Sequence, residues 1–328
     1  MATTRARTDQ VIGCVLGGAV GDALGAPFEG LWSRSIPQQE ELLSGFAEFE
    51  GYPRGQYTDD TQLTIATLES IVQHRRIDPA EVARSIANLW RSQEVVGPGG
   101  ACTAAADRFL SGIPWPECGA AIGQAGNGTA MRTAALGLFF LNAPAKLPET
   151  VAQISSITHR DPRSIAGGVA IAAAARELAS KSGIEGQDLC LAVAQAMAPF
   201  HAEFADLVAR LPSVLHAKER AALEYIAWSG SSHREFDEVI ITPYVVPTVL
   251  ASLWAVLAFP LSWSAAVAAA IRLGGDVDTL GAIVGGLMGA RFGADAIPTH
   301  LAAGVLNSNR LRTLAIQYSE VIVQAARE

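Results

Sequence analysis

Apolar residues recur at helical spacing along most of the chain. In the segment 58–74, for example, Leu63, Ile65, Ala66, Leu68 and Ile71 give a helical periodicity. No run of alternating apolar and polar residues is bounded by turn residues, and the one candidate strand, 239–246, is interrupted by Pro243. The pattern therefore predicts an all-α fold, with helices over 9–24, 58–74, 79 to near 97, 101–110, 129–141, 161–181, 187–200, 203–216, 218–228, 245–258, 263–272, 279–291 and 310–326.

No segment of the chain marks a domain boundary. The sequence contains no linker-like, low-complexity or strongly charged stretch and no repeat of fixed period. Although 328 residues exceed a typical domain, half of them are hydrophobic, which is enough for one large core. We therefore expect one compact domain over 1–328, in which about the first eight residues are flexible. A long loop from 26 to about 57, rich in proline and glycine, separates the first two helices.

The composition argues against nucleic-acid binding and against a membrane span. The net charge is -8 and the pI is about 5.3, with no run rich in Lys and Arg. The most hydrophobic stretch, 245–259, is shorter than the roughly 20 residues that cross a bilayer. Arginines followed by the apolar run 11–20 imitate a signal peptide, but three glycines interrupt that run. The four cysteines show neither metal-binding nor disulfide spacing, which fits a reducing cytoplasm.

Two acidic clusters, far apart in the sequence, each precede an apolar helical segment. One is 58–61 (TDDT) and the other is 274–279 (GGDVDT). Carboxylate and hydroxyl oxygens without nearby Cys or His favour Mg²⁺, Mn²⁺ or Ca²⁺ over Zn²⁺. Helix N-termini also stabilise negative charge. Each cluster alone is more often a helix cap or a turn, so the question is whether the two converge on one cation site.

Five motifs occur in a fixed order along the chain. They are 17–25 (GGAVGDALG) with Glu29 after it, 57–62 (YTDDTQ), 126–132 (GNGTAMR), Thr158-His159, and 274–281 (GGDVDTLG). With these motifs the chain resembles the ADP-ribosylglycohydrolase family, from about residue 11 to residue 291, and we see no departure at the metal-binding positions. The segment 33–55 has no clear counterpart, and we expect it to carry substrate preference.

The resemblance implies an all-α fold around two divalent cations, Mg²⁺ or Mn²⁺. It also implies cleavage of the bond from the anomeric ribose carbon of ADP-ribose to an acceptor, often a protein arginine or serine, or the acetyl group of O-acetyl-ADP-ribose. The partner is thus an ADP-ribosylated protein or a small ADP-ribose conjugate. The oligomeric state stays open, although we favour a monomer. The metal ligands that the resemblance implies are Thr58, Asp59, Asp60, Asp276, Asp278 and Thr279.

Scission at an anomeric carbon needs an activated water and a proton for the leaving group. The resemblance makes Glu29 an acidic loop residue that closes over the metals, and we assign it the acid/base or gating role. Asp59 and Asp276 are rival bases. Without the resemblance, Glu29 could equally be a solvated loop residue.

Glycine-rich turns before helices offer backbone N–H groups to phosphate. The resemblance places diphosphate contacts at Gly126, Asn127 and Gly128, although Asn-Gly is also a common plain turn. A second candidate is the pair Gly99 and Gly100, although such glycines more often belong to an ordinary loop with no role in binding. Three further candidates follow. The backbone of Met131 extends the first of these turns, and Arg132 contacts a phosphate or pairs with an acid. His159 lies on the substrate side of the pocket or caps a helix as a structural residue.

Two other functions remain open from the sequence. One is a non-catalytic ADP-ribose binder or crystallin-like structural protein. The presence of all six implied metal ligands argues against this alternative. The other is a different Mg²⁺-dependent phosphohydrolase, which would have no use for the glycine-rich turn at 126–128 together with Glu29.

Overall fold

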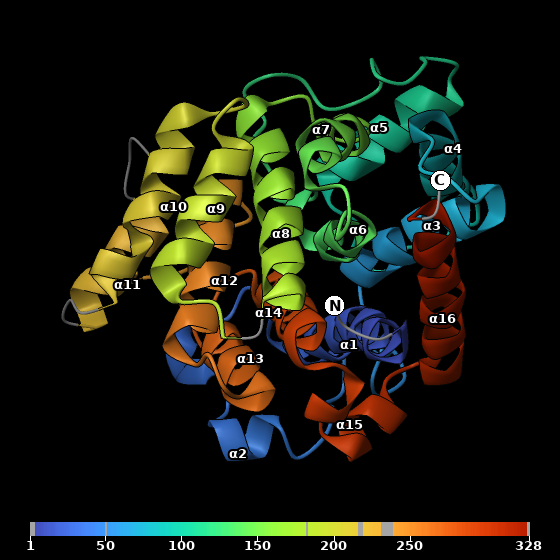
Figure 1. The fold of residues 1–328 in the computed structure, drawn as a ribbon. Helices are drawn as coiled ribbons and strands as arrows, with labels where there is room; N and C mark the ends of the chain where they lie inside the picture. The colour runs from blue at the N-terminus through green and yellow to red at the C-terminus, as the bar shows by residue number, and fades with distance from the viewer. Residues whose placement is uncertain (1–3, 50, 182, 216–218, 231–238, 327–328) are drawn as a thin grey trace.

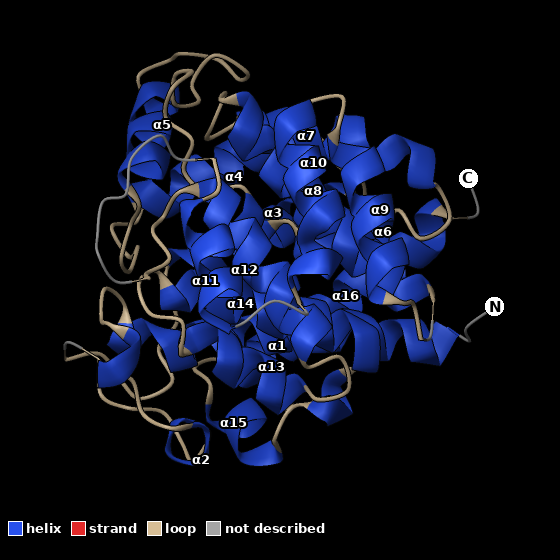
Figure 2. Cartoon of the chain, turned by 90° about the vertical axis from the view of Figure 1, so that its left-hand side faces the viewer, coloured by secondary structure: helices blue, strands red, loops and turns tan. Residues whose placement is uncertain are grey.

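The fold is all-α, as the apolar pattern predicts. The computed structural model describes residues 4–49, 51–181, 183–215, 219–230 and 239–326, and within these ranges it contains helices and isolated β-bridges but no β-strand (Figures 1 and 2). The α-helices are α1 Thr4–Gly25, α2 Gln39–Leu42, α3 Asp59–His74, α4 Pro79–Arg91, α5 Gly100–Leu110, α6 Ala134–Phe139, α7 Leu147–Ser156, α8 Pro162–Ser180, α9 Gly186–Met197, α10 Ala202–Val214, α11 Glu219–Trp228, α12 Val245–Ala258, α13 Trp263–Ile271, α14 Val277–Phe292, α15 Thr299–Gly304 and α16 Ser308–Ala325.

Helix α14 is the centre of the fold. Every residue from 277 to 290 is buried, as expected for a helix that is apolar on all sides. Helices α1, α8, α12 and α13 pack around it. On the flank, α8, α9 and α10 stand side by side, and α16 lies on the opposite flank against α1 and α3 (Figure 1).

Helix α1 and helix α14 approach closely because glycines line both contact faces. A Cβ atom added at Gly281 would lie 2.6 Å from the carbonyl carbon of Gly21, a distance that real Cβ atoms essentially never show. The two backbones can therefore touch only while both positions lack side chains. Along the same face, Gly13 meets Gly289 and Gly17 meets Gly285. This contact determines the position of the acidic residues at the ends of both helices.

The first helical segment is also long and apolar enough to cross a bilayer. The candidate span is Arg7–Phe28, but 78% of its most apolar window is buried inside the fold. Helices α14 and α16 cover it, so α1 is accounted for as a core helix. Its first described residue is Thr4, and the helix therefore includes most of the segment that we expected to be flexible.

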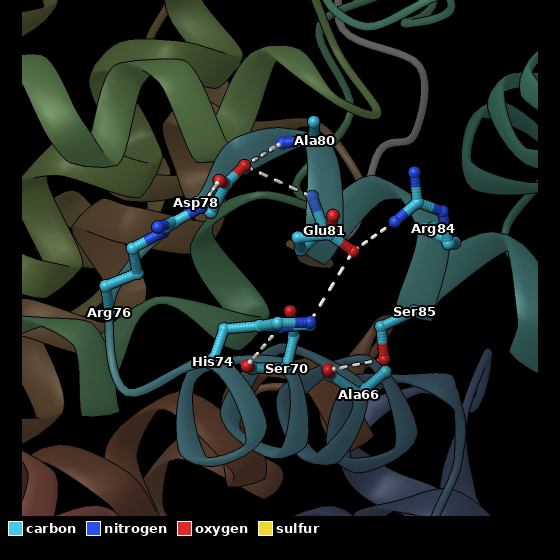
Figure 3. Close-up of polar contacts among 9 residues, drawn as sticks. All are labelled: Ala66, Ser70, His74, Arg76, Asp78, Ala80, Glu81, Arg84 and Ser85. Atoms are coloured by element: carbon cyan, nitrogen blue, oxygen red, sulfur yellow. Dashed lines mark hydrogen bonds and ion pairs between the residues drawn. The ribbon is translucent and has the colours of Figure 1, made fainter.

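Helix α3, which begins with an acidic cluster, is braced by α4 (Figure 3). Ser85 Oγ donates to the carbonyl of Ala66 across the pair at 2.8 Å. His74 Nε2 lies 3.7 Å from Glu81 Oε2. Asp78 caps α4 by accepting from two backbone N–H groups of its first turn, as the Asp-Pro pair predicts.

Several boundaries differ from the sequence-based expectation. The helix expected over 129–141 is divided into a short 3-10 turn, Ala130–Arg132, and α6. Helix α4 ends at residue 91 rather than near 97. The short helices α2, α7 and α15 were missed; α2 and α15 are too short to show a periodic apolar pattern. The segment 239–246 is a loop up to residue 244 and then the start of α12, as expected.

Candidate active site

The N-terminus of α3 is attached to α1 through one buried carboxylate, that of Asp22. Its Oδ1 accepts from the backbone N–H and the hydroxyl of Thr58, at 2.9 and 3.0 Å. Its Oδ2 accepts from the backbone N–H and the hydroxyl of Thr61, at 3.0 and 2.6 Å. Thr58 does occupy the N-cap position, but its hydroxyl does not cap the helix, because it is directed to Asp22 instead.

The two acidic clusters meet at Thr58. Its Oγ1 lies 3.3 Å from Asp60 Oδ2 and 3.3 Å from Asp278 Oδ2. All six ligand candidates of the two clusters are buried. The structure therefore brings the start of α3 and the start of α14 to one place, which the residue pattern posed as a question and the family resemblance implied.

A tight turn at Gly274 and Gly275 carries the second cluster. Both glycines have positive φ angles, +83° and +91°, which residues with side chains rarely adopt. Two backbone hydrogen bonds join this turn to the loop after α1, because Gly30 N–H donates to Gly275 O at 2.8 Å and Gly275 N–H donates to Leu31 O at 2.9 Å. The turn thereby holds Glu29 beside the acidic cluster.

Glu29 is exposed at the edge of the cluster, whereas the aspartates are buried. One carboxylate oxygen from each of Glu29, Asp276 and Asp278 lies within 4.8 Å of the other two. Oxygens at such spacing can share one hard cation. Glu29 thus joins the buried acids from the solvent side.

The buried carboxylates repel one another and hold protons more tightly than exposed ones do. Burial raises the pKa of Asp59 to about 7, and burial together with the Asp278 charge raises the pKa of Asp60 and of Asp276 well above the usual range. Among the described residues, Asp60 Oδ1 and Asp278 Oδ1 have no hydrogen-bond partner although they are buried. Hard divalent cations would satisfy these oxygens and offset the repulsion, so the donor set fits Mg²⁺ or Mn²⁺.

All but two of the site residues predicted from the sequence line a single pocket of about 220 Å³. The exceptions are Thr58, which is fully buried against Asp60 and Asp278, and Arg132, which is buried outside the pocket lining. The predicted residues that line the pocket are Glu29, Asp59, Asp60, Gly99, Gly100, Gly126, Asn127, Gly128, Met131, His159, Asp276, Asp278 and Thr279.

The turn 126–128 is held against the acidic cluster by Asn127. Its side-chain Nδ2 donates to Asp276 and, at 3.0 Å, to Thr248 Oγ1. Its backbone N–H donates to Pro243 O at 3.0 Å. Asn127 therefore ties the candidate phosphate cradle to a candidate metal ligand, in addition to forming a turn.

His159 lies directly behind this turn. A Cβ atom at Gly126 would stand 2.9 Å from His159 Nε2, and one at Gly128 would stand 2.8 Å from His159 Cε1. Burial, with the nearby charge of Arg132, lowers the pKa of His159 to about 3, so the ring is neutral near pH 7. Both glycines are thus required by contact with the imidazole.

A profile of the ADP-ribosylglycohydrolase family matches residues 3–327. The chain belongs to the ADP-ribosylglycohydrolase family. The ADP-ribosyl-(dinitrogen reductase) glycohydrolase of Rhodospirillum rubrum is 28% identical over 298 residues, which cover 89% of this chain and 88% of that protein. The ADP-ribosylarginine hydrolase Tri1 of Pseudomonas putida (strain GB-1) is 27% identical over 94% of this chain and 77% of that protein. A solved structure of an ADP-ribosylglycohydrolase-related protein complex matches with a TM-score of 0.74 and 28% identity, over 97% of this chain and 99% of that one.

These findings confirm the resemblance drawn from the five motifs. As a member of the ADP-ribosylglycohydrolase family the chain is a hydrolytic enzyme. The family and its relatives indicate ADP-ribosyl hydrolase activity, and the family is generally dependent on divalent metals, for which this chain offers a carboxylate cluster.

Sequence reasoning overlooked the role of one residue that supports the ADP-ribosylglycohydrolase site, Asp22, and expected other partners for a second, Arg132. Asp22 was quoted only as part of a motif, yet an acid inside a Gly/Ala-rich apolar helix needs buried partners and could have been singled out for that reason. We expected the Arg132 side chain to contact a phosphate or to pair with an acidic side chain. It is buried instead beneath the turn 126–128, and its guanidinium donates to the carbonyls of Gly128 and Ile154.

Proposed function

We propose that this chain hydrolyses the bond between the anomeric ribose carbon of ADP-ribose and a protein side chain, and so releases ADP-ribose. One observation carries the proposal: a single pocket holds the two acidic clusters, Glu29 and the glycine-rich turn 126–128. A phosphohydrolase would need the acids alone, whereas a nucleotide sugar also needs a cradle for its diphosphate.

In this proposal the two ends of the pocket bind different parts of the substrate. Gly126, Asn127 and Gly128 cradle the diphosphate, with Met131 beside them and His159 behind them. Gly99 and Gly100 stand at the N-terminus of α5, where backbone N–H groups and the helix dipole favour a phosphate. The acids then face the ribose.

The proposed cofactor is a pair of divalent cations, Mg²⁺ or Mn²⁺. When bound, such ions orient ribose hydroxyls and lower the pKa of a coordinated water. The two orphaned carboxylate oxygens on Asp60 and Asp278 support this assignment. The proposed ligands are Thr58, Asp59, Asp60, Asp276, Asp278 and Thr279.

Hydrolysis forms a bond from the water oxygen to the anomeric carbon and breaks the bond from that carbon to the acceptor. The water loses a proton and the departing side chain gains one. Of the three candidate acids, Asp59 and Asp276 are buried and also belong to the proposed ligand set. We assign the proton transfer to Glu29, because it is the exposed acid at the solvent side of the cluster, where the acceptor leaves.

We propose a protein arginine as the acceptor. Glu29 at the exposed edge complements a guanidinium, and one relative is named an ADP-ribosylarginine hydrolase. Serine-linked ADP-ribose and O-acetyl-ADP-ribose are the alternatives. We place the reaction in the cytoplasm, with the enzyme as a monomer; the free, buried state of all four cysteines fits a reducing compartment.

The test is to incubate the protein with Mg²⁺ or Mn²⁺ and a panel of arginine-linked, serine-linked and O-acetyl ADP-ribose substrates, and to measure free ADP-ribose. We expect release from the arginine conjugate and none from the Asp276→Ala variant. No release from any substrate, with tight ADP-ribose binding, would make the protein a binder. Phosphate release from simple phosphoesters would make it a phosphohydrolase.

A further inference from the structure

The side-chain amide of Gln62 bonds two backbone positions of the loop that joins α4 to α5. Its Nε2 donates to Glu94 O at 2.8 Å, and its Oε1 accepts from Val96 N–H at 2.9 Å. Gln62 lies on α3, close to one helical turn after Asp59. It therefore connects the helix that begins at the acidic cluster to a loop that leads to the pocket.

Asp59 holds the same loop at the neighbouring positions. Its backbone N–H donates to Val96 O at 2.8 Å, and its Oδ2 accepts from Gly99 N–H at 3.1 Å. Gly99 and Gly100 then line the pocket at the start of α5. Gln62 and Asp59 together anchor the loop from Glu94 to Gly99.

Most of this loop is exposed and rich in glycine. Within 92–100 only Val96 is buried, and glycine occupies positions 97, 99 and 100, with Gly97 at a φ of +63°. Glycines lose the most backbone entropy on ordering. Hydrogen bonds from α3 are therefore the means by which this exposed, glycine-rich rim keeps one position.

We infer that Gln62 is a positioning residue for ligand binding: it holds the glycine-rich rim so that Gly99 and Gly100 meet the ligand in a preformed arrangement. The inference rests on the proposed function in taking that ligand as ADP-ribose. Gln62 acts through the loop: within the part of the chain that the structure describes, its side chain hydrogen-bonds only to Glu94 and Val96. Its loss should weaken ligand binding while the acidic cluster keeps its metal and its chemistry.

The decisive variant is Gln62→Met, which keeps the length of the side chain and removes both hydrogen bonds. Its matched control is Gln73→Met, the same change at an exposed position of the same helix. We expect Gln62→Met to raise the calorimetric Kd for ADP-ribose in Mg²⁺, and the KM, by about tenfold. We expect kcat and the Kd for Mg²⁺ alone to stay within about twofold of wild type. The control should match wild type in all four quantities.

A second variant, Gln62→Glu, keeps the acceptor for Val96 N–H and loses the donor to Glu94 O. It should give a smaller rise in the ADP-ribose Kd, about threefold, and it replaces Gln62→Met if thermal unfolding shows that the latter does not fold. An unchanged ADP-ribose Kd overturns the inference, and so does a loss of kcat or Mg²⁺ affinity as large as the change in KM. Calorimetry needs no turnover. If the wild-type protein binds ADP-ribose but liberates none from any conjugate, the proposed function fails and this inference can still be tested by the Kd values.

Discussion

Thr58 Oγ1 lies 3.3 Å from Asp278 Oδ2, although 220 residues separate the two in the sequence. The contact joins the start of α3 to the start of α14 in a region where all the neighbouring aspartates are buried. Buried acids of like charge are stable together only when cations or protons compensate them. The expected consequence is that metal binding and protein stability are linked.

We expect Mg²⁺ to stabilise the wild-type protein and to have little effect on Asp278→Asn. At a free Mg²⁺ concentration 100 times Kd, mass action adds about 2.7 kcal/mol to the free energy of unfolding. In chelator the variant should unfold at a higher temperature than wild type, because it lacks one of the repelling charges. Thermal unfolding with and without Mg²⁺ measures both effects. Asp295→Asn, at an exposed position, is the control and should behave as wild type; an equal Mg²⁺ response in Asp278→Asn would contradict the metal assignment.

Replacing Glu29 by Gln should lower kcat by at least about 100-fold, because the amide cannot transfer the proton that general acid-base catalysis requires. The Kd for ADP-ribose should change much less, since the cradle at 126–128 is untouched. Initial rates of ADP-ribose release and calorimetry separate the two quantities. Glu40→Gln, another exposed glutamate, is the control. Full turnover by the Glu29 variant would remove this residue from the mechanism.

A single methyl group at the α1–α14 contact should destabilise the fold. In Gly281→Ala the new Cβ would lie 2.6 Å from the carbonyl carbon of Gly21, so the helices must separate, at a cost of about 1–3 kcal/mol in unfolding free energy. Gly286→Ala is the matched control on the same helix, because its nearest neighbour would be 3.5 Å away. Denaturant unfolding should show the control near or slightly above wild type. Equal stability of both variants would contradict the close-packing argument.

His159 should make the stability of the protein fall in mild acid. Its pKa in the folded protein is about 3, below the ordinary value of 6.5. As the pH falls below 6.5 the unfolded chain takes up a proton that the folded protein does not, and the free energy of unfolding drops by about 2 kcal/mol between pH 7 and pH 5. Unfolding of wild type and His159→Gln in Mg²⁺ across this range isolates the effect, since their other titrating groups are the same. Parallel pH curves for the two proteins would show that the imidazole is not buried in its neutral form.

Local signals in the sequence determined the class of fold and the list of candidate residues. Long apolar periods predicted the major helices, and the Asp78-Pro79 pair predicted the start of α4, because such patterns report how one segment buries its own face. Helices α2 and α15 were missed, because helices of so few residues show too little periodicity. The motif order was sufficient to identify the family.

Only the tertiary structure decided how these residues act together. Periodicity shows that a face is buried but not what covers it. The family resemblance implied that Thr58 and Asp278 share one centre, but the imidazole of His159 behind the turn 126–128 and the hydrogen bonds from Gln62 to its loop could not be inferred. Such positions follow from the packing of the helices; the close contact of α1 with α14, for example, is possible only because the glycines there have no Cβ atom. The sequence therefore determined which residues are available for chemistry, and the packing of the helices decided which of them share one pocket.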